Sequence, residues 1–323
     1  MAIYAALTAQ DLDAVSLAYG LGQPLEATGI PQGSINSNYR LQTPGGRLFL
    51  RHTTARSAEA LAFEARLLAH LGEAGFPGPR IVPTVRGEPF LPLAGGRVTL
   101  FHYLAGEELT RAQLTTDHLE RLGAELGKLH RLGNSFLGER ENPYDDSTVE
   151  GWLRELEIHS DPQLRAIAAE LIALLERTRR PHRALIPRGV IHADIFLDNV
   201  KWLGDRVSAI FDFEMACRDA LILDVAITLN AWCFEDRYQP PLCAALLRGY
   251  QQERPFRPGE AEHLLDFALF GAIRYTASRI RDFHLSPLPP ERLARKDFRT
   301  YLARARQLAA LDSAGFQRLL GLE

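Results

Sequence analysis

Four polar residues near the middle of the chain have types and a spacing that could carry chemistry. They are His192, Asp194, Asn199 and Asp212. The first two follow the β-branched run that ends at Ile191, the third precedes a second apolar run, and the apolar run 207–211 leads directly into the fourth. Short apolar runs bounded by turns indicate strands. We therefore expect the two aspartates at the rims of neighbouring strands, facing one cleft.

Transfer of a phosphoryl group to a hydroxyl requires such a set. One carboxylate accepts the hydroxyl proton, while a second carboxylate and a neutral oxygen ligand hold Mg²⁺ against the phosphates of ATP. The spacing His-x-Asp-x-x-x-x-Asn matches a kinase catalytic loop. We predict Asp194 as the base and His192 as a support for the loop. Asn199 and Asp212 are the predicted Mg²⁺ ligands.

The alternative is that these residues only cap strands and turns. An isolated His-x-Asp would favour that interpretation. The full spacing, followed by an apolar run that ends in an acid, is much rarer by chance, so the chemical interpretation is preferred.

A glycine-containing turn at residues 29–39 is the candidate for phosphate binding, because backbone N–H groups in such turns can cradle phosphates. The pattern is neither Gly-x-Gly-x-x-Gly nor a Walker sequence. An ordinary hairpin loop is therefore the alternative. The candidate residues are Gly33, Ser34, Asn36, Ser37 and Asn38.

Kinases also place a cation, usually a lysine paired with a glutamate on a helix, on the nucleotide phosphates. Lysine occurs only at residues 128, 201 and 296, so the first hundred residues contain none. Arg51 is the candidate in its place, with Glu64 as its partner and Glu59 as a weaker rival. The guanidinium of arginine is planar and forked, whereas the ammonium of lysine is a compact charge, so an arginine must contact the phosphates with a different geometry. A surface position for Arg51 is the alternative.

The first hundred residues read as strands around one helix. Residues 39–43 and 47–51 flank a Pro-Gly-Gly turn and predict a hairpin. Ser57 is placed to begin a helix that ends near Gly72 and Gly75. The apolar run 97–101 predicts a further strand.

Beyond residue 106 the sequence is mainly helical, with apolar periods near 3.6 residues at 119–132, 163–178, 259–283 and 295–310. This change predicts an α+β fold of two lobes, a nucleotide-binding lobe over residues 1–104 and a catalytic and acceptor-binding lobe over 105–323. The hinge is expected at residues 102–106, and His102 and Leu104 complete the candidate nucleotide-binding residues.

Composition limits the possible functions. The chain has 323 residues, is 46% hydrophobic and carries a formal charge of −3, which favours neither nucleic acid nor an anionic membrane surface as a partner. No secretory leader or membrane span is evident. Three cysteines, an odd number at wide spacing, are typical of free thiols in a reducing cytoplasm. The sequence does not determine the oligomeric state.

Three stretches carry a resemblance to the aminoglycoside phosphotransferase superfamily, which has a kinase-like fold, and within it to the bacterial homoserine kinases. They are residues 29–39, residues 190–200 and the run from Phe211 to Glu235. The resemblance covers nearly the full chain. It implies transfer of the ATP γ-phosphate to the hydroxyl of L-homoserine, which gives O-phospho-L-homoserine on the route to threonine.

Two positions depart from the family pattern. Glu214 stands where an aromatic residue is usual, and Leu197 replaces a more usual proline or glutamine. Glu214 lies two residues after a predicted metal ligand, so its carboxylate could change the acceptor.

A homoserine site needs an arginine for the carboxylate of the acceptor. Arg274 and Arg281 are the candidates, since seven residues apart they share a helix face. An acidic site containing Glu214 and Asp219 would instead favour choline, an amino alcohol or an aminoglycoside. A catalytically inactive, nucleotide-binding scaffold is a further alternative, motivated by the missing lysine.

Overall fold

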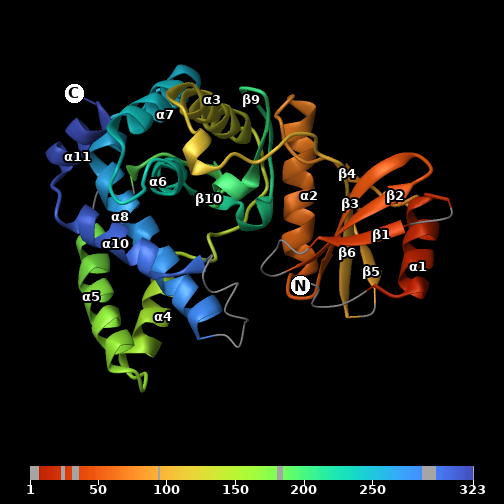
Figure 1. The fold of residues 1–323 in the computed structure, drawn as a ribbon, viewed down its shortest axis with the longest axis horizontal. Helices are drawn as coiled ribbons and strands as arrows, with labels where there is room; N and C mark the ends of the chain where they lie inside the picture. Colours follow the sequence, from red (N-terminus) through yellow and green to blue (C-terminus); the bar gives the residue numbers. More distant parts are fainter. Residues whose placement is uncertain are drawn as a thin grey trace.

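The computed structural model describes residues 7–22, 26–30, 36–93, 95–179, 185–285 and 296–322. Its first part is an antiparallel sheet of six strands, and its second part is mainly helical (Figure 1). The α+β class is therefore confirmed. The strands of the sheet are β1 (Glu26–Ile30), β2 (Ser37–Thr43), β3 (Gly46–Thr53), β4 (Ile81–Val82), β5 (Leu91–Leu93) and β6 (Gly96–His102).

The predicted hairpin forms the centre of this sheet. Strands β2 and β3 pair with Tyr39 opposite Leu50, and β3 also pairs with β6, in the strand order β1-β2-β3-β6-β4. Side chains that alternate along these strands fill a small core. Its members are Val15, Tyr19, Tyr39, Leu41, Leu50, Val98 and Leu100.

A helix that the sequence analysis did not predict covers this core. Helix α1 (Ala9–Tyr19) begins with a capping box in which Thr8 and Asp11 exchange hydrogen bonds. The prediction of one helix in the first hundred residues was wrong. The buried positions Val15 and Tyr19 face the sheet, but the helix is short and its apolar face is weakly marked in the sequence.

Helix α2 (Ala58–Glu73) begins at Ser57, whose hydroxyl accepts a hydrogen bond from the amide of Ala60, as predicted. Its apolar residues do not join the small core of the sheet. Phe63, Leu67 and Leu71 belong to the large core of the second part of the chain. The helix thus stands between the sheet and the helical part (Figure 1).

The chain leaves the sheet after His102 and is fixed to the second part almost at once. The carbonyl of Ala105 accepts a hydrogen bond from the hydroxyl of Ser208, and Glu107 exchanges two backbone hydrogen bonds with Trp202. Gly106 lies between them with φ of 112°, and a Cβ there would be 2.6 Å from the carbonyl oxygen of Trp202. Only glycine fits this crossing.

The second part is built around two nearly fully buried helices, α6 and α8. Every residue of α6 is buried, so no amphipathic period marks it in the sequence. The helices are α3 (Thr116–Gly133), α4 (Asp146–Glu157), α5 (Pro162–Thr178), α6 (Leu221–Trp232), α7 (Pro240–Glu253), α8 (Glu260–Arg279), α10 (Arg299–Ala309) and α11 (Ser313–Leu320). A π-helical turn, Ile280–His284, follows α8.

Two small sheets carry the predicted chemistry. Strand β7 (Arg188–Ile191) pairs with β10 (Cys217–Ala220), and β8 (Val200–Leu203) pairs with β9 (Arg206–Ile210). The expectation that the two aspartates follow neighbouring strands was wrong, because β7 and β9 belong to different sheets.

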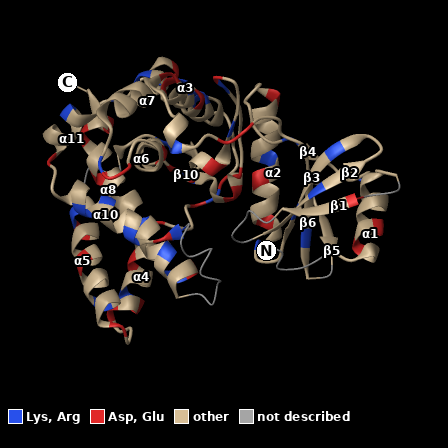
Figure 2. Cartoon of the chain, in the orientation of Figure 1, with Lys and Arg blue, Asp and Glu red and all other residues tan. Residues whose placement is uncertain are grey.

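Basic and acidic residues are interspersed over both parts of the chain (Figure 2). Within the described ranges, no helix is long and apolar enough to span a membrane. Cys217, Cys233 and Cys243 are buried free thiols.

Helices α3 and α7 pack unusually closely at glycines. A Cβ on Gly249 would lie 1.8 Å from the carbonyl oxygen of Glu120, and a Cβ on Gly123 would lie 2.0 Å from that of Leu246. These neighbouring atoms belong to the backbone, so they cannot move aside as the end of a flexible side chain can. The contact therefore depends on glycine at both positions.

We predict that Gly249→Ala lowers the free energy of unfolding by about 1–3 kcal/mol through overpacking, although alanine is the better helix former. Gly151→Ala in α4 is the matched control, because a Cβ there meets nothing within 4 Å. The control should stabilise by about 0.5–1 kcal/mol. Urea unfolding of both variants measures this, and equal stabilities would contradict the packing argument.

Candidate active site

The loop after β7 is held by a buried carboxylate that the sequence analysis did not assign to the site. Asp224, in the first turn of α6, accepts hydrogen bonds from the amides of His192 at 2.7 Å and Ala193 at 2.8 Å. Nε2 of His130 lies 3.2 Å from the same carboxylate. Ala193 has φ of 64°, a conformation that costs energy in a residue with a Cβ. Asp224 thus holds a strained loop in place.

Burial by itself would raise the pKa of Asp224, but hydrogen bonding and the nearby histidines outweigh it and lower the pKa. The carboxylate is therefore ionised. Its location in the first turn of α6 also suits a negative charge, because the positive end of the helix dipole lies there.

His192 supports the loop, as predicted. Its Nε2 lies 3.0 Å from the carbonyl oxygen of Phe211, and its Nδ1 accepts a hydrogen bond from the amide of Asp194 at 3.3 Å. These partners require a neutral ring protonated at Nε2. Burial lowers the pKa of His192, which is consistent with that form. The histidine thereby connects the two small sheets and brings Asp194 toward Asp212.

The carboxylate of Asp194 is held at both oxygens. Oδ1 accepts from the hydroxyl of Tyr275 at 2.8 Å, and Oδ2 accepts from Nδ2 of Asn199 at 3.1 Å. Nδ2 of Asn199 also donates to the backbone carbonyl of Asp194 at 2.8 Å. The carboxylate is thus oriented before any substrate arrives.

The predicted metal ligands offer oxygen atoms that suit Mg²⁺. The amide nitrogen of Asn199 is used to hold Asp194, and within the described ranges no hydrogen bond engages its Oδ1. Asp212 is 43% exposed, and its nearest cation, Nη1 of Arg51, is 3.8 Å away. The described residues contain no group of three or more His, Cys, Asp or Glu that could hold a metal. Mg²⁺ in kinases needs few protein ligands, because phosphate and water oxygens supply the rest.

Asp212 also has a positive φ, 67°. Its location between the two parts of the chain, with partial loss of water, raises the pKa of its carboxyl well above the ordinary range, and the negative charge of Glu214 adds to this. A nearby divalent cation would favour the ionised form. Ala193 and Asp212 are the described non-glycine residues with positive φ, and both adjoin the site.

Arg51 is buried and paired with Glu64, as predicted. Its Nη2 donates to Glu64 at 2.7 Å, and Nη1 lies 3.0 Å from Glu214. Burial would lower the pKa of Arg51, but the surrounding carboxylates, Glu64 first, raise it. Burial by itself would raise the pKa of Glu64, but the charges of Arg51 and Arg56 outweigh it, and the pKa is lowered. The alternative of a surface Arg51 was wrong.

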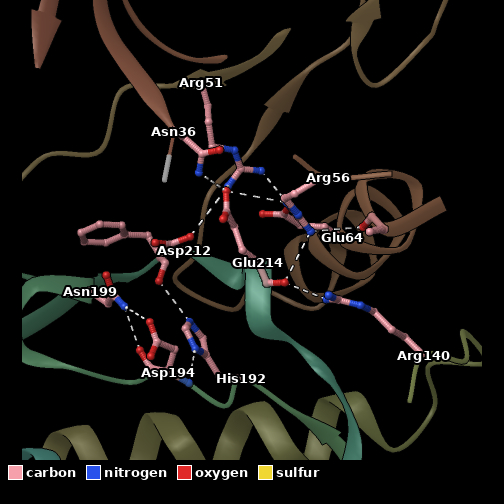
Figure 3. Close-up of polar contacts among 12 residues, drawn as sticks. Asn36, Arg51, Arg56, Glu64, Arg140, His192, Asp194, Asn199, Asp212 and Glu214 are labelled. Atoms are coloured by element: carbon pink, nitrogen blue, oxygen red, sulfur yellow. Dashed lines mark hydrogen bonds and ion pairs between the residues drawn. The ribbon is translucent and has the colours of Figure 1, made fainter. Parts of the chain in front are cut away.

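Arg56 is a cation that the sequence analysis missed, because the segment after β3 carries no recognisable motif. Its Nη1 pairs with Glu64 and lies 3.8 Å from Glu214. Arg140 joins from the second part of the chain and donates to the carbonyl of Glu214 at 2.7 Å. Figure 3 shows these groups gathered around Glu214, between the strand that carries Arg51 and the loop of Asp194.

The acceptor candidates have different surroundings. Arg274 is buried, donates to the carbonyl of Ala193 at 3.2 Å and stacks on Tyr144 and Tyr275. Arg281 pairs with Asp282 and stacks on Trp152. Tyr144 and Trp152 are in edge contact, which links the two arginines through their aromatic neighbours. Arg274 is in α8 and Arg281 is in the π-helical turn that follows it, where its side chain is exposed.

Asp219 already has polar partners. Its carboxylate accepts from Asn142 at 2.7 Å, pairs with Arg188 at 2.9 Å and accepts from the amide of Ala220. Glu214 is likewise engaged by cations and by Asn36. These contacts leave Asp219 less suited to bind an acceptor amine, and they hold Glu214 against Arg51 and Asn36 in this structure.

The remaining nucleotide-binding candidates adjoin the sheet. Gly33 and Ser34 lie outside the described residues. Asn36, Ser37 and Asn38 lie at the start of β2 and are largely buried, with Asn38 opposite Arg51 in the register. His102 is exposed at the end of β6, and Leu104 is half-buried in the segment that follows.

We predict that Asp224→Ala lowers the free energy of unfolding by about 2–6 kcal/mol, from about 1–3 kcal/mol for each of the two buried amides left without a partner. Thermal and urea unfolding measure the loss. Thr228→Val, one turn further along α6, is the control. It removes one hydrogen bond to the carbonyl of Asp224 and should cost about 0.5–1.5 kcal/mol. Similar losses in the two variants would show that Asp224 does not hold the loop.

Comparison with known proteins gives the family. Residues 26–258 match the model of the phosphotransferase enzyme family. Homoserine kinase of Parvibaculum lavamentivorans is 35% identical over 312 residues, 95% of each chain. Homoserine kinase of Brucella abortus (strain S19) is 35% identical over 320 residues, 97% of this chain and 96% of that protein.

Solved structures give the same fold. The amicoumacin kinase hAmiN has a TM-score of 0.74 at 20% identity, over 95% of this chain and 96% of that one. A microcompartment-associated aminopropanol kinase has a TM-score of 0.69 at 18% identity, over 95% and 98%. The two-part fold agrees with this result. The chain belongs to the phosphotransferase enzyme family, in the group that contains these homoserine kinases.

Proposed function

We propose that this enzyme transfers the γ-phosphoryl group of ATP to the hydroxyl of L-homoserine, with Mg²⁺, and forms O-phospho-L-homoserine for threonine synthesis. The orientation of Asp194 is the observation that carries the proposal. Its two carboxylate oxygens are fixed by Tyr275 and Asn199 on a loop whose backbone is held by Asp224. A carboxylate so held is ready to accept a proton from a hydroxyl placed beside it.

Asp194 acts as the base that orients the acceptor hydroxyl and accepts its proton. His192 keeps the loop in register through its two hydrogen bonds and does not contact the reacting atoms. Asn199 and Asp212 are the residues that would hold Mg²⁺. When bound, the metal supplies positive charge that neutralises the developing charge on the phosphates.

The sheet and α2, with residues 1–104, form the proposed nucleotide lobe. Arg51, held by Glu64, takes the place of the usual lysine. Backbone N–H groups around Gly33, Ser34, Asn36, Ser37 and Asn38 cradle phosphates. The segment of His102 and Leu104 borders the nucleotide where the lobes meet, and the lobes close about residues 102–106.

Arg274 and Arg281 are the proposed groups for the acceptor carboxylate in the second lobe, residues 105–323. Arg274 touches the carbonyl of Ala193, next to Asp194, so a carboxylate bound nearby would place the homoserine hydroxyl within reach of the base. Two lines of support favour homoserine over choline, an amino alcohol or an aminoglycoside. Asp219 already has partners, and the relatives at 35% identity are homoserine kinases.

The proposed setting is the cytoplasm, with a small molecule rather than nucleic acid or membrane as partner. An inactive scaffold is less consistent with the site, because the base, both metal ligands and a paired cation are all present.

We predict that Asp194→Asn lowers kcat by about 10²–10⁴-fold with little change in the KM for ATP, because the base acts only in the chemical step. Asp198→Asn, in the same loop with an exposed side chain, is the matched control and should retain nearly full activity. Coupled ADP-release assays measure both. Near-normal turnover by Asp194→Asn would refute the assignment of the base.

The acceptor is tested with a panel of L-homoserine, 3-aminopropan-1-ol, choline and kanamycin under saturating Mg-ATP. 3-Aminopropan-1-ol is homoserine without its carboxylate. We expect kcat/KM for homoserine to exceed kcat/KM for 3-aminopropan-1-ol by at least about 10²-fold, because a site that pairs with a polar group of its substrate strongly rejects an analogue without that group. Turnover of any amine acceptor without turnover of homoserine would overturn the proposal.

A further inference from the structure

Three donors from the nucleotide lobe converge on a single oxygen of Glu214. Nδ2 of Asn36 lies 2.6 Å from Oε1, Nη1 of Arg51 lies 3.0 Å from it, and Nη1 of Arg56 lies 3.8 Å from it. These residues come from the position just before β2, from β3 and from the segment before α2 (Figure 3). One oxygen ringed by two guanidinium groups and an amide has the surroundings of a phosphate oxygen.

Both terminal nitrogens of Arg51 are paired with carboxylates. Nη2 is paired with Glu64, and Nε is buried without a partner among the described residues. Nη1 is therefore the group of Arg51 that can reach a phosphate, and Glu214 occupies it. The same Nη1 lies 3.8 Å from Asp212, so a phosphate held by a metal at Asp212 would reach the place that Glu214 fills.

The backbone of Glu214 is anchored independently of its carboxylate. Its carbonyl accepts from Nη1 of Arg140 at 2.7 Å and from Nη2 of Arg56 at 3.4 Å. Arg140 also donates to the carbonyl of Ala216 at 2.7 Å. The side chain can consequently leave the cations while the segment that follows Asp212 stays in place.

The charge balance around the arginines is consistent with replacement of the Glu214 carboxylate by a phosphate. Arg51 and Arg56 are balanced by Glu64 and Glu214 before a nucleotide is present. Glu64 is buried on α2 and pairs with both arginines, whereas Glu214 also accepts a hydrogen bond from Asn36. A phosphate that enters would place its negative charge beside Glu214, so one of the two anions must withdraw.

We propose that Asn36, Arg51 and Arg56 form a binding site for a phosphate oxygen of the nucleotide, and that Glu214 fills this site until the nucleotide displaces it. This inference rests on the proposed use of a nucleotide and adds Arg56 to the phosphate-binding residues. Glu214 is then an internal anion that keeps the two arginines in place and competes with ATP, rather than a ligand of the acceptor.

The test is the affinity of the full-length protein for MgADP and for magnesium tripolyphosphate, measured by titration calorimetry. Glu214→Gln keeps the shape and removes the charge. It should bind both probes at least about fivefold more tightly, in the range usual for coupled binding sites. Glu214→Asp, with the carboxylate withdrawn by one methylene, should bind more tightly as well. Arg56→Met should weaken binding of tripolyphosphate.

Glu108→Gln is the matched control, because it removes a half-exposed carboxylate that pairs with Lys201 rather than with Arg51. It should leave both affinities unchanged. Thermal unfolding verifies that each variant is folded. Weaker or unchanged binding by a folded Glu214→Gln would overturn the inference, and so would unchanged binding by Arg56→Met.

Binding and turnover separate this inference from the proposed function. A wild-type enzyme that phosphorylates homoserine, with no gain in affinity on Glu214→Gln, would refute the inference alone. A gain in affinity for MgADP, without turnover of any acceptor, would refute the proposed reaction alone.

Discussion

The interaction on which the site depends is the pairing of the buried Asp224 carboxylate with the amides of His192 and Ala193. Ala193 has a left-handed backbone that a residue with a Cβ adopts only under constraint. The carboxylate supplies that constraint, and the first turn of α6 favours its charge. With the loop fixed, His192 reaches the carbonyl of Phe211, the residue directly before Asp212.

The interface between the two parts of the chain has a second requirement, which is charge balance. Helix α2 packs its apolar face into the large core and directs Glu64 toward Arg51 on the sheet. Glu214, from the other side, completes a network of two arginines and two glutamates. This arrangement balances the buried arginines in a part of the chain, residues 1–104, that has no lysine. The network gives Glu214, two residues after Asp212, cationic partners.

Much of the fold and of the site could be predicted from local patterns. The hairpin of β2 and β3, the start of α2 at Ser57 and the long helices have turn residues, caps or periods that act within a few residues. Helix α6 could not be predicted in this way, because a helix buried on every side has no amphipathic period. Helix α1 was missed because its apolar face is narrow, and the assumed neighbours β7 and β9 proved to belong to separate sheets.

The sequence by itself determined the kind of chemistry, because the types and spacing of His192, Asp194, Asn199 and Asp212 are local properties of one segment. It also indicated Arg51 with Glu64, since a strand followed by a helix brings such positions together. Only the tertiary structure decided the roles of Asp224, Arg56 and Glu214. Their partners are distant in sequence; Glu214, for instance, accepts a hydrogen bond from Asn36. Burial and charge pairing between such distant residues arise only when the chain is folded.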